Sequence, residues 1–256
     1  MYTDRQKREI FHFLFLERLL HASDPKLYVV KGGVNLRFFY HSPRYSEDMD
    51  LDVLGGAVHT LKKNGYKILE EPSFQRSLRA FGIERIILND PSKAKQTQTV
   101  QRFRVRLVSS AGEELPTKIE FSRRSKGSEK YTLDRVDSEI ARAYQRGSFL
   151  CHHYSGEIAV LQKIEALAER GLPQARDVFD LQVLKERGFL EKANPLKHLK
   201  PATLIKAGKN LELLTYDDFV GHVLEFLDEP DKRRYEGVNS WKEMKNFVGK
   251  ALQRNG

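Results

Sequence analysis

KGGVNLRFFYHSPRYSEDMDLD, residues 31–52, is the stretch that decides the fold of this chain. It ends with three aspartates at every second position, Asp48, Asp50 and Asp52. Successive side chains of a strand point to opposite faces, so a strand here places these carboxylates on one face and the apolar residues between them on the other. Like charges this close repel unless a cation lies among them, and Mg²⁺ prefers carboxylate and phosphate oxygens. The stretch therefore predicts a metal site.

Two glycines open this stretch, directly after a short apolar, β-branched run. Residues 27–30 have the composition of a strand, which Gly32 and Gly33 end. Glycine permits a positive φ and lets backbone N–H groups approach a phosphate with no side chain in the way. A helix over residues 34–40 would direct its positive N-terminal end to the same place. The turn therefore predicts a phosphate-binding site.

The composition indicates a folded, basic chain. With 256 residues, 40% of them hydrophobic, it can build one large or two small domains. The net charge of +9 favours a nucleic acid or nucleotide partner, although a charge that only keeps the protein dissolved is an equally open explanation. A single cysteine, Cys151, excludes an internal disulfide and a cysteine-rich zinc site. The chain has no apolar run of about 18 residues, and its N-terminus is charged. We therefore expect a cytoplasmic protein with no membrane partner.

A hairpin is predicted in the middle of the chain, from residues 102–108 and 117–123 with the AGEEL turn between them. Its first strand alternates apolar side chains with three arginines, Arg102, Arg104 and Arg106. The arginines either face solvent or lie against RNA phosphates, and a solvated face is the more common case.

Glu120 lies in the second strand of this hairpin, on the face that its apolar residues do not occupy. If this strand pairs beside the aspartate strand, Glu120 completes a carboxylate cluster with Asp48 and Asp50. The alternative is a surface glutamate paired with Lys118, which lies on the same face. Both alternatives stay open in the sequence.

Helices are predicted before and after the aspartate strand. The N-terminal helix has Thr3 as a candidate cap and is apolar over so broad a face that we expect burial on more than one side. A short helix after the aspartate strand is predicted to end at Gly65. Residues 123–130 are polar and small, which indicates a loop.

The second half of the chain reads as helical, with helices at residues 156–171 and 173–188 and three more toward the C-terminus. The sequence thus predicts an α/β protein of the α+β type in two regions. Residues 1–125 would form a core with a small mixed sheet that bears the carboxylates. Residues 131–256 would form a helical region that completes the nucleotide site.

These parts suit nucleotidyl transfer, which needs metal-held phosphates, positive charge at the triphosphate and an oriented nucleophile. Lys163 or Arg176 could meet the phosphate charge. A GG pair and a D-x-D pair are weak signals when taken alone. Their order, an apolar strand, GG, a helix and a D-x-D strand, resembles the arrangement in the nucleotidyltransferase superfamily that includes polymerase-β-like enzymes.

Two motifs resemble those of the AbiEii/AbiGii-type toxins, whose relatives include the MenT type. The first, K-G-G-x-x-L followed by R-x-S-x-D-x-D, falls on Lys31, Gly32, Gly33, Leu36, Arg44, Ser46, Asp48 and Asp50. The second, a helical lysine followed by R-D-x-x-D-L, falls on Lys163, Arg176, Asp177, Asp180 and Leu181. The resemblance covers residues 28–187, and no motif ties the C-terminal part to the family.

The resemblance implies a nucleotidyltransferase toxin of a toxin–antitoxin or phage-defence system, with an NTP donor, Mg²⁺ or Mn²⁺, an antitoxin partner and an RNA acceptor, the 3′ end of tRNA. It implies catalytic roles for Asp48, Lys163 and Asp177, with Asp177 or Asp180 acting at the acceptor or ordering the lysine. The nucleotide-binding residues would be Lys31, Gly32, Gly33, Ser46, Lys163, Arg176 and Asp180. The metal ligands would be Asp48, Asp50 and Glu120.

Several alternatives stay open at this point. Asp52 is an extra aspartate, so the metal pair is either 48/50 or 50/52; the motif register favours 48/50, and Asp52 would then be lost cheaply. Lys163 could be a solvated helix lysine, with Asp177 and Asp180 paired to Arg176 along one helix. The acceptor could be a small molecule or a protein hydroxyl, and a non-enzymatic nucleic-acid-binding protein is a third possibility. The sequence does not indicate which NTP is used, which antitoxin binds or which oligomer forms.

Overall fold

The computed structural model of the chain describes residues 2–89, 97–123 and 130–253. The chain divides into two compact units, each with its own contacts. We call residues 1–39 and 45–154 the sheet unit, and residues 40–44 and 155–256 the helical unit. The loop predicted at residues 123–130 falls almost entirely outside the described residues.

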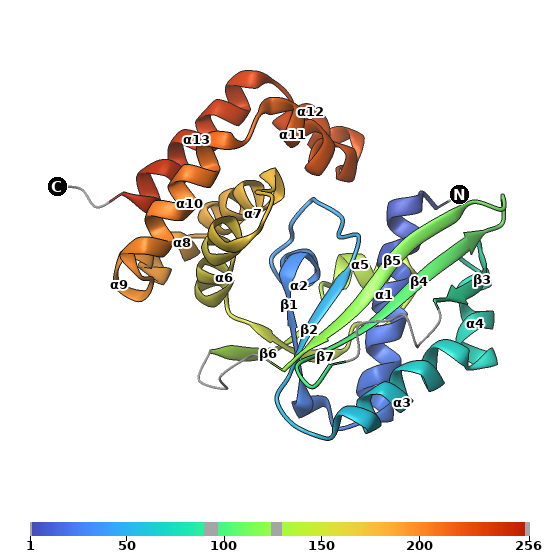
Figure 1. Cartoon of the computed structure of the whole chain (residues 1–256). Coiled ribbons are helices and arrows are strands. Elements are labelled where there is room, and N and C mark those ends of the chain that lie inside the picture. Colours follow the sequence, from blue (N-terminus) through green and yellow to red (C-terminus); the bar gives the residue numbers. More distant parts are fainter. Residues whose placement is uncertain (1, 90–96, 124–129, 254–256) are drawn as a thin grey trace. The chain divides into compact units, whose positions relative to one another are not determined.

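The sheet unit contains a mixed sheet with the strand order β3-β4-β5-β2-β1-β7-β6. The pairs β1–β7 and β2–β5 are parallel, and the other neighbours are antiparallel. Figure 1 shows α1 on the same side of this sheet as α3 and α4. The strands are β1 (Tyr28–Lys31), β2 (Met49–Val53), β3 (Ile83–Leu88), β4 (Val100–Ser109), β5 (Glu114–Ser122), β6 (Tyr131–Arg135) and β7 (Leu150–Tyr154).

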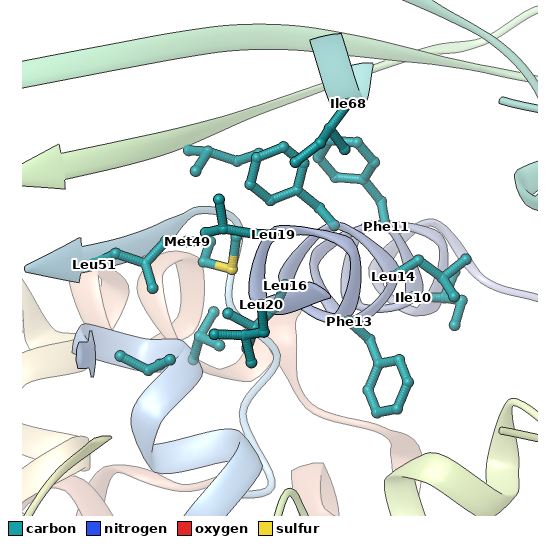
Figure 2. Close-up of a cluster of buried hydrophobic side chains, with 14 of the residues drawn as sticks. Ile10, Phe11, Phe13, Leu14, Leu16, Leu19, Leu20, Met49, Leu51 and Ile68 are labelled. Atoms are coloured by element: carbon teal, nitrogen blue, oxygen red, sulfur yellow. The ribbon is translucent and has the colours of Figure 1, made fainter. Parts of the chain in front are cut away.

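Helix α1 (Asp4–Ala22) is the centre of the sheet unit's core. Thr3 and Gln6 form a capping box at its start, as the candidate cap predicted. Every side chain from Ile10 to Leu16 is buried, which is the pattern of a helix covered all round. Figure 2 shows Phe11 and Phe13 leaving α1 in different directions. The expectation of burial on more than one side is confirmed.

Shorter helices complete this unit: η1 (Pro25–Leu27), α2 (Gly32–Phe39), α3 (Val58–Glu70), α4 (Pro72–Arg79) and α5 (Ser138–Ala143). The predicted helix end at Gly65 is wrong, because α3 continues through it. A Cβ at Gly65 would lie 2.5 Å from Cζ of Phe103, so this glycine lets the β4 phenylalanine pack against the helix. The residue is a packing glycine and not a helix terminator.

The predicted hairpin is confirmed, since β4 and β5 pair antiparallel with Arg102 opposite Glu120. Strand β5 also pairs with the aspartate strand β2, and this parallel register places Asp50 opposite Glu120. On the other side of β2, Lys31 at the end of β1 lies opposite Asp50. Met49 and Leu51 enter the hydrophobic core beneath the sheet. The carboxylates therefore occupy the opposite face, as the alternation predicted.

Strands β6 and β7 extend the sheet beyond the boundary expected from the sequence. The sequence predicts that residues 131–154 belong to the helical region, whereas their contacts belong to the sheet unit. Their strand structure depends on pairing: β7 lies parallel to β1, and the exposed β6 pairs with β7. The expected role of the helical region in the nucleotide site stays a prediction.

The helical unit is built around α6 (Gly156–Glu169), which contacts α7 (Ala175–Glu186) and α10 (Pro201–Leu213). Helices α6 and α7 agree with the helices predicted at residues 156–171 and 173–188. Phe219 stacks on Trp241, with ring centroids 4.9 Å apart, in the aromatic core of this unit. The remaining elements are α8 (Phe189–Ala193), α9 (Pro195–His198), α11 (Tyr216–His222), η2 (Leu224–Phe226), α12 (Glu229–Tyr235) and α13 (Val238–Leu252).

The prediction of three helices toward the C-terminus is wrong. The described residues from 195 to 253 form the five helices α9 to α13; proline lies at the start of α9, α10 and α12, and Gly237 precedes α13. Among the helices of the described residues, none combines the length and the apolar composition needed to cross a membrane.

Candidate functional site

Three carboxylates share the sheet face that is turned away from the hydrophobic core. Asp50 and Glu120 lie opposite each other on β2 and β5, and Asp48 directly precedes β2. All three side chains are partly exposed. The sheet register thus assembles the residues that the sequence assigned to a metal, although Glu120 is 70 positions or more from the two aspartates in the sequence.

Asp50 is the central carboxylate of this group. Burial raises its pKa, and the neighbouring Asp48 and Glu120 charges raise it further, against the lowering effect of Lys31 and Lys118. Within the part of the chain that the structure describes, its side chain accepts no hydrogen bond and forms no ion pair. Its oxygens are therefore available to a ligand.

Gly32 packs directly against Asp50. It has a φ of +67°, and a Cβ there would lie 2.8 Å from Oδ2 of Asp50. Glycine meets both demands, since it adopts positive φ freely and adds no atom beside the carboxylate. The first turn of α2, whose N–H groups have no partners within the helix, therefore begins beside the carboxylates.

Asp52 has a different environment from Asp50. Its side chain is buried, Lys31 Nζ lies 2.6 Å from Oδ1, and the Tyr154 hydroxyl donates to Oδ2 at 2.7 Å. Both carboxylate oxygens are thus engaged inside the protein. A 50/52 metal pair would require Asp52 to give up these contacts. It also places Lys31, which the resemblance assigned to the nucleotide, in an ion pair with Asp52.

Two cations that the sequence did not assign to the site hold the outer carboxylates. Lys118 Nζ lies 2.6 Å from Oδ2 of Asp48, and Arg102 Nη2 lies 2.5 Å from Oε2 of Glu120. The alternation of the two hairpin strands already placed these residues on the carboxylate face. The register between the strands cannot be read from the sequence. This register determines which cation pairs with which carboxylate.

The donor set fits a divalent cation in its chemistry. Carboxylate oxygens are the ligands that Mg²⁺ and Mn²⁺ prefer, and three carboxylates lie on one face. Among the described residues, no group of three acidic, histidine or cysteine side chains is gathered closely enough to hold a metal ion. Lys118 and Arg102 each form an ion pair with one of the outer carboxylates.

The loop before β2 is fixed by hydroxyl groups. Ser46 Oγ donates to the carbonyl oxygen of Asp48 at 2.8 Å, and Thr117 Oγ1 donates to the carbonyl oxygen of Glu47 at 2.6 Å. Because the Thr117 hydroxyl has one hydrogen, it accepts from His12 Nε2, which lies 2.8 Å away. Ser46, expected at the triphosphate, here shapes the backbone that presents Asp48.

His12 is buried under the Asp48 loop. Burial lowers its pKa to about 4, against a raising effect of the Asp48 charge, and Arg8 lowers it further. The imidazole is therefore neutral at physiological pH. The sequence showed this residue only as one polar position on an apolar helix.

The helical unit contains a second charged network. Lys163 Nζ on α6 lies 2.5 Å from Asp180 Oδ2 and 3.2 Å from Asp177 Oδ1, both carboxylates being fully buried on α7. Arg170 Nε adds a bond of 2.8 Å to Asp177. Arg44 Nη2 lies 3.0 Å from both oxygens of Asp180.

This network decides between the alternatives for Lys163. The lysine is buried, so it is not a solvated helix residue. Burial alone would raise the pKa of Asp180, but Arg44 and Lys163 outweigh it and hold that pKa below its ordinary range. The aspartates pair with Lys163, Arg44 and Arg170, whereas Arg176 is half-buried at the start of α7. Asp177 and Asp180 therefore fix the position of Lys163.

Solved structures share the fold of this chain. A nucleotidyltransferase toxin from Mycobacterium tuberculosis H37Rv, MenT4, is 16% identical with a TM-score of 0.60, over 98% of this chain and 85% of that one. A putative nucleotidyltransferase from H. pylori is 21% identical with a TM-score of 0.56, over 98% and 97%. JHP933 from Helicobacter pylori is 20% identical with a TM-score of 0.53, over 98% and 94%. The predicted nucleotidyltransferase fold is confirmed.

The sequence itself matches a family. None of the curated proteins matches it. The family described as "Nucleotidyl transferase AbiEii toxin, Type IV TA system" matches residues 14–240, well beyond the span of the two motifs. Because this match covers most of the chain, the protein belongs to the AbiEii family of nucleotidyltransferase toxins.

Proposed function

We propose that this toxin transfers a nucleoside monophosphate from an NTP to RNA, the expected acceptor being the 3′ end of tRNA, with Mg²⁺ or Mn²⁺. Nucleotidyl transfer by the toxin of a toxin–antitoxin system follows from the family. The metal, the acceptor and the residue roles are our proposal. The observation that carries it is the β2–β5 register, which sets Asp50 opposite Glu120 with Gly32 packed against Asp50.

Asp48, Asp50 and Glu120 would hold the divalent cation. Such a cation neutralises phosphate oxygens and aligns the entering and leaving oxygens. Asp50 supports this role most directly, since its carboxylate lacks a hydrogen bond or ion pair within the described residues. Ser46 would contribute by holding the backbone at Asp48.

Gly32 and Gly33 would bind the triphosphate through backbone N–H groups. They form the first residues of α2, where N–H groups lack intrahelical partners and the helix end carries partial positive charge. Because Gly32 lies close to Asp50, a phosphate bound there would lie near the carboxylate that would hold the cation. Lys31 would have to leave Asp52 to reach a phosphate.

In the proposed reaction, an acceptor hydroxyl oxygen attacks the α-phosphorus of the NTP. A new oxygen–phosphorus bond forms while the bond from the α-phosphorus to the bridging oxygen breaks, and pyrophosphate leaves. The hydroxyl proton passes to water, since Glu120 is assigned to the cation together with Asp48 and Asp50.

The roles expected in the helical unit stay predictions of the family motif. Lys163 would bind phosphate and Arg176 would add positive charge, while Asp177 and Asp180 would order the lysine. The ion pairs of Lys163 with both buried aspartates support the ordering role over a direct role of Asp177 at the acceptor.

A transfer assay tests the proposal. The protein is incubated with each α-labelled NTP, Mg²⁺ and total tRNA, and label is expected on RNA with at least one NTP. Asp50→Asn keeps the shape and removes the charge, so activity should fall by about 10²-fold or more. Glu114→Gln, an exposed acid on the same strand β5, serves as the control and should retain activity. Blank RNA with every NTP contradicts the RNA acceptor.

The same assay separates the alternatives. A small-molecule or protein acceptor predicts label on that acceptor while tRNA stays blank. A non-enzymatic nucleic-acid-binding protein predicts that Asp48→Ala leaves toxicity unchanged, and membership in a nucleotidyltransferase family weighs against it. The proposal also includes a cognate antitoxin as partner and action in the cytoplasm, since both NTP and tRNA are found there.

A further inference from the structure

Two of the three proposed metal ligands are already held by cations of the chain itself. Asp48 receives the Lys118 ammonium at 2.6 Å on Oδ2 and the Lys118 main-chain N–H at 3.2 Å on Oδ1. Glu120 receives Arg102 through Nη2 at 2.5 Å and Nε at 2.7 Å, both on Oε2. Each ion pair therefore occupies oxygens that a metal ion would need.

The side chains in these pairs are between 22% and 33% exposed, so water and ions can reach them. Ion pairs with this much solvent contact are weak, and exchanging one for a metal–carboxylate bond is feasible. Without the two cations, the like charges of Asp48, Asp50 and Glu120 on one sheet face would repel one another. The pairs thus stabilise the carboxylate cluster before a metal arrives.

We propose that Lys118 and Arg102 are built-in counter-ions that a divalent cation displaces when it binds to Asp48, Asp50 and Glu120. This inference rests on the proposed metal site. Its consequence is that the chain holds its metal more weakly than three free carboxylates would, because part of the binding free energy is used to break two ion pairs. Removing one counter-ion should therefore tighten metal binding.

Arg104 provides a matched control. It lies between Arg102 and Arg106 on β4, opposite Lys118, and is exposed. Within the described residues its side chain takes part in no ion pair. Loss of Arg104 removes a positive charge from the same sheet face without releasing a carboxylate. It therefore separates ion-pair exchange from a general change of charge.

The test is direct binding of Mn²⁺ to the full chain without nucleotide, followed by the electron paramagnetic resonance signal of free Mn²⁺. Lys118→Met keeps the length of the side chain and should tighten binding about threefold to tenfold. Lys118→Arg keeps the counter-ion and should stay within about twofold of the wild type. Arg104→Met should also stay within about twofold. Arg102→Met, which releases Glu120, should tighten binding as Lys118→Met does.

The inference fails if neither Lys118→Met nor Arg102→Met tightens Mn²⁺ binding, or if Arg104→Met tightens it as much as they do. Asp50→Asn separates this failure from that of the proposed function. If Asp50→Asn leaves Mn²⁺ binding intact, the metal site itself is wrong. If it abolishes binding while both counter-ion variants bind like the wild type, only the counter-ion inference is wrong. Circular dichroism confirms that each variant is folded.

Discussion

At the scale of single residues, Gly32 is the position where fold and chemistry constrain each other most tightly. Its φ of +67° is unfavourable for any residue with a Cβ, and that Cβ would lie 2.8 Å from Asp50 Oδ2. We expect Gly32→Ala to lower the free energy of unfolding by more than the 1–2 kcal/mol or so that positive φ alone costs. It should also reduce nucleotidyl transfer, because Asp50 has to move.

Gly112→Ala is the control for Gly32→Ala, measured by urea unfolding and by the transfer assay. Gly112 has a φ of +83° in the turn between β4 and β5, and a Cβ there meets nothing within 4 Å. This variant should show the conformational cost with activity retained per folded molecule. If both variants lose activity equally, the contact between Gly32 and Asp50 has no catalytic importance.

Asp52 shows what a sequence cannot reveal at this scale. The motif register marked it as the aspartate that the protein would lose cheaply. The structure gives it a buried ion pair with Lys31 and a hydrogen bond from Tyr154, so its loss removes the carboxylate that both side chains contact. The Tyr154 contact joins residues far apart in the sequence, and no local pattern predicts it.

At the scale of helices and strands, the predictions succeeded where a pattern repeats along one segment. Alternation in residues 102–108 gave the hairpin and the apolar pattern gave α1. They failed where a partner element decides the outcome. Gly65 looks like a helix end in the sequence, but it is a packing position for Phe103. The exposed strand β6 is paired with β7.

The same dependence applies to the candidate site. The alternation of residues 117–123 predicted that Lys118 and Glu120 lie on one face of the strand. An ion pair between them was one of the two predicted alternatives for Glu120. In the fold each pairs with a different group, Lys118 with Asp48 and Glu120 with Arg102. Strand register follows from long-range packing, so the cations of the site could be listed from the sequence but not assigned to their carboxylates.

A hydrogen-bonded chain from His12 on α1 through Thr117 on β5 to the Glu47 carbonyl joins three segments beneath Asp48. The His12 pKa is about 4 in the folded protein and about 6.5 in the unfolded chain. Between these values the unfolded chain binds more protons, so stability is complete above pH 6.5 or so and falls as the pH drops toward 4. The full loss is on the order of 3 kcal/mol.

His12→Gln tests this pH dependence, because the amide can still donate to Thr117 but does not titrate in this range. Unfolding by urea, followed by circular dichroism at several pH values from 7.5 or so down to 4 or so, should give a flatter profile for the variant than for the wild type. His21→Gln, which changes an exposed histidine on the same helix, should keep the wild-type profile. Equal profiles for wild type and His12→Gln would exclude His12 as the source.

At the scale of the whole molecule, the chain leaves the sheet unit after α2, contributes residues 40–44 to the helical unit and then returns to form β2. Arg44 lies in that short segment and pairs with Asp180, which is 136 positions away in the sequence. Arg44 of the first family motif thus contacts Asp180 of the second motif inside the helical unit. The positions and the order of the motifs can be read from the sequence, whereas the contact between Arg44 and Asp180 depends on the fold.

Arg44 should therefore be a stability residue of the helical unit. Arg44→Met leaves the fully buried Asp180 with Lys163 as its remaining ion-pair partner among the described residues, and loss of one partner from a buried pair costs about 3–5 kcal/mol. The double variant Arg44→Met/Asp180→Asn should lose less than the sum of the single variants, because it removes the uncompensated charge. Fluorescence of Trp241, the single tryptophan, reports unfolding of this unit.

Arg106→Met is the control for Arg44→Met. It breaks the exposed ion pair with Glu114 in the sheet unit and should lower the free energy of unfolding by about 1 kcal/mol or less. A loss of similar size for Arg44→Met and Arg106→Met would mean that the buried network does not stabilise the helical unit.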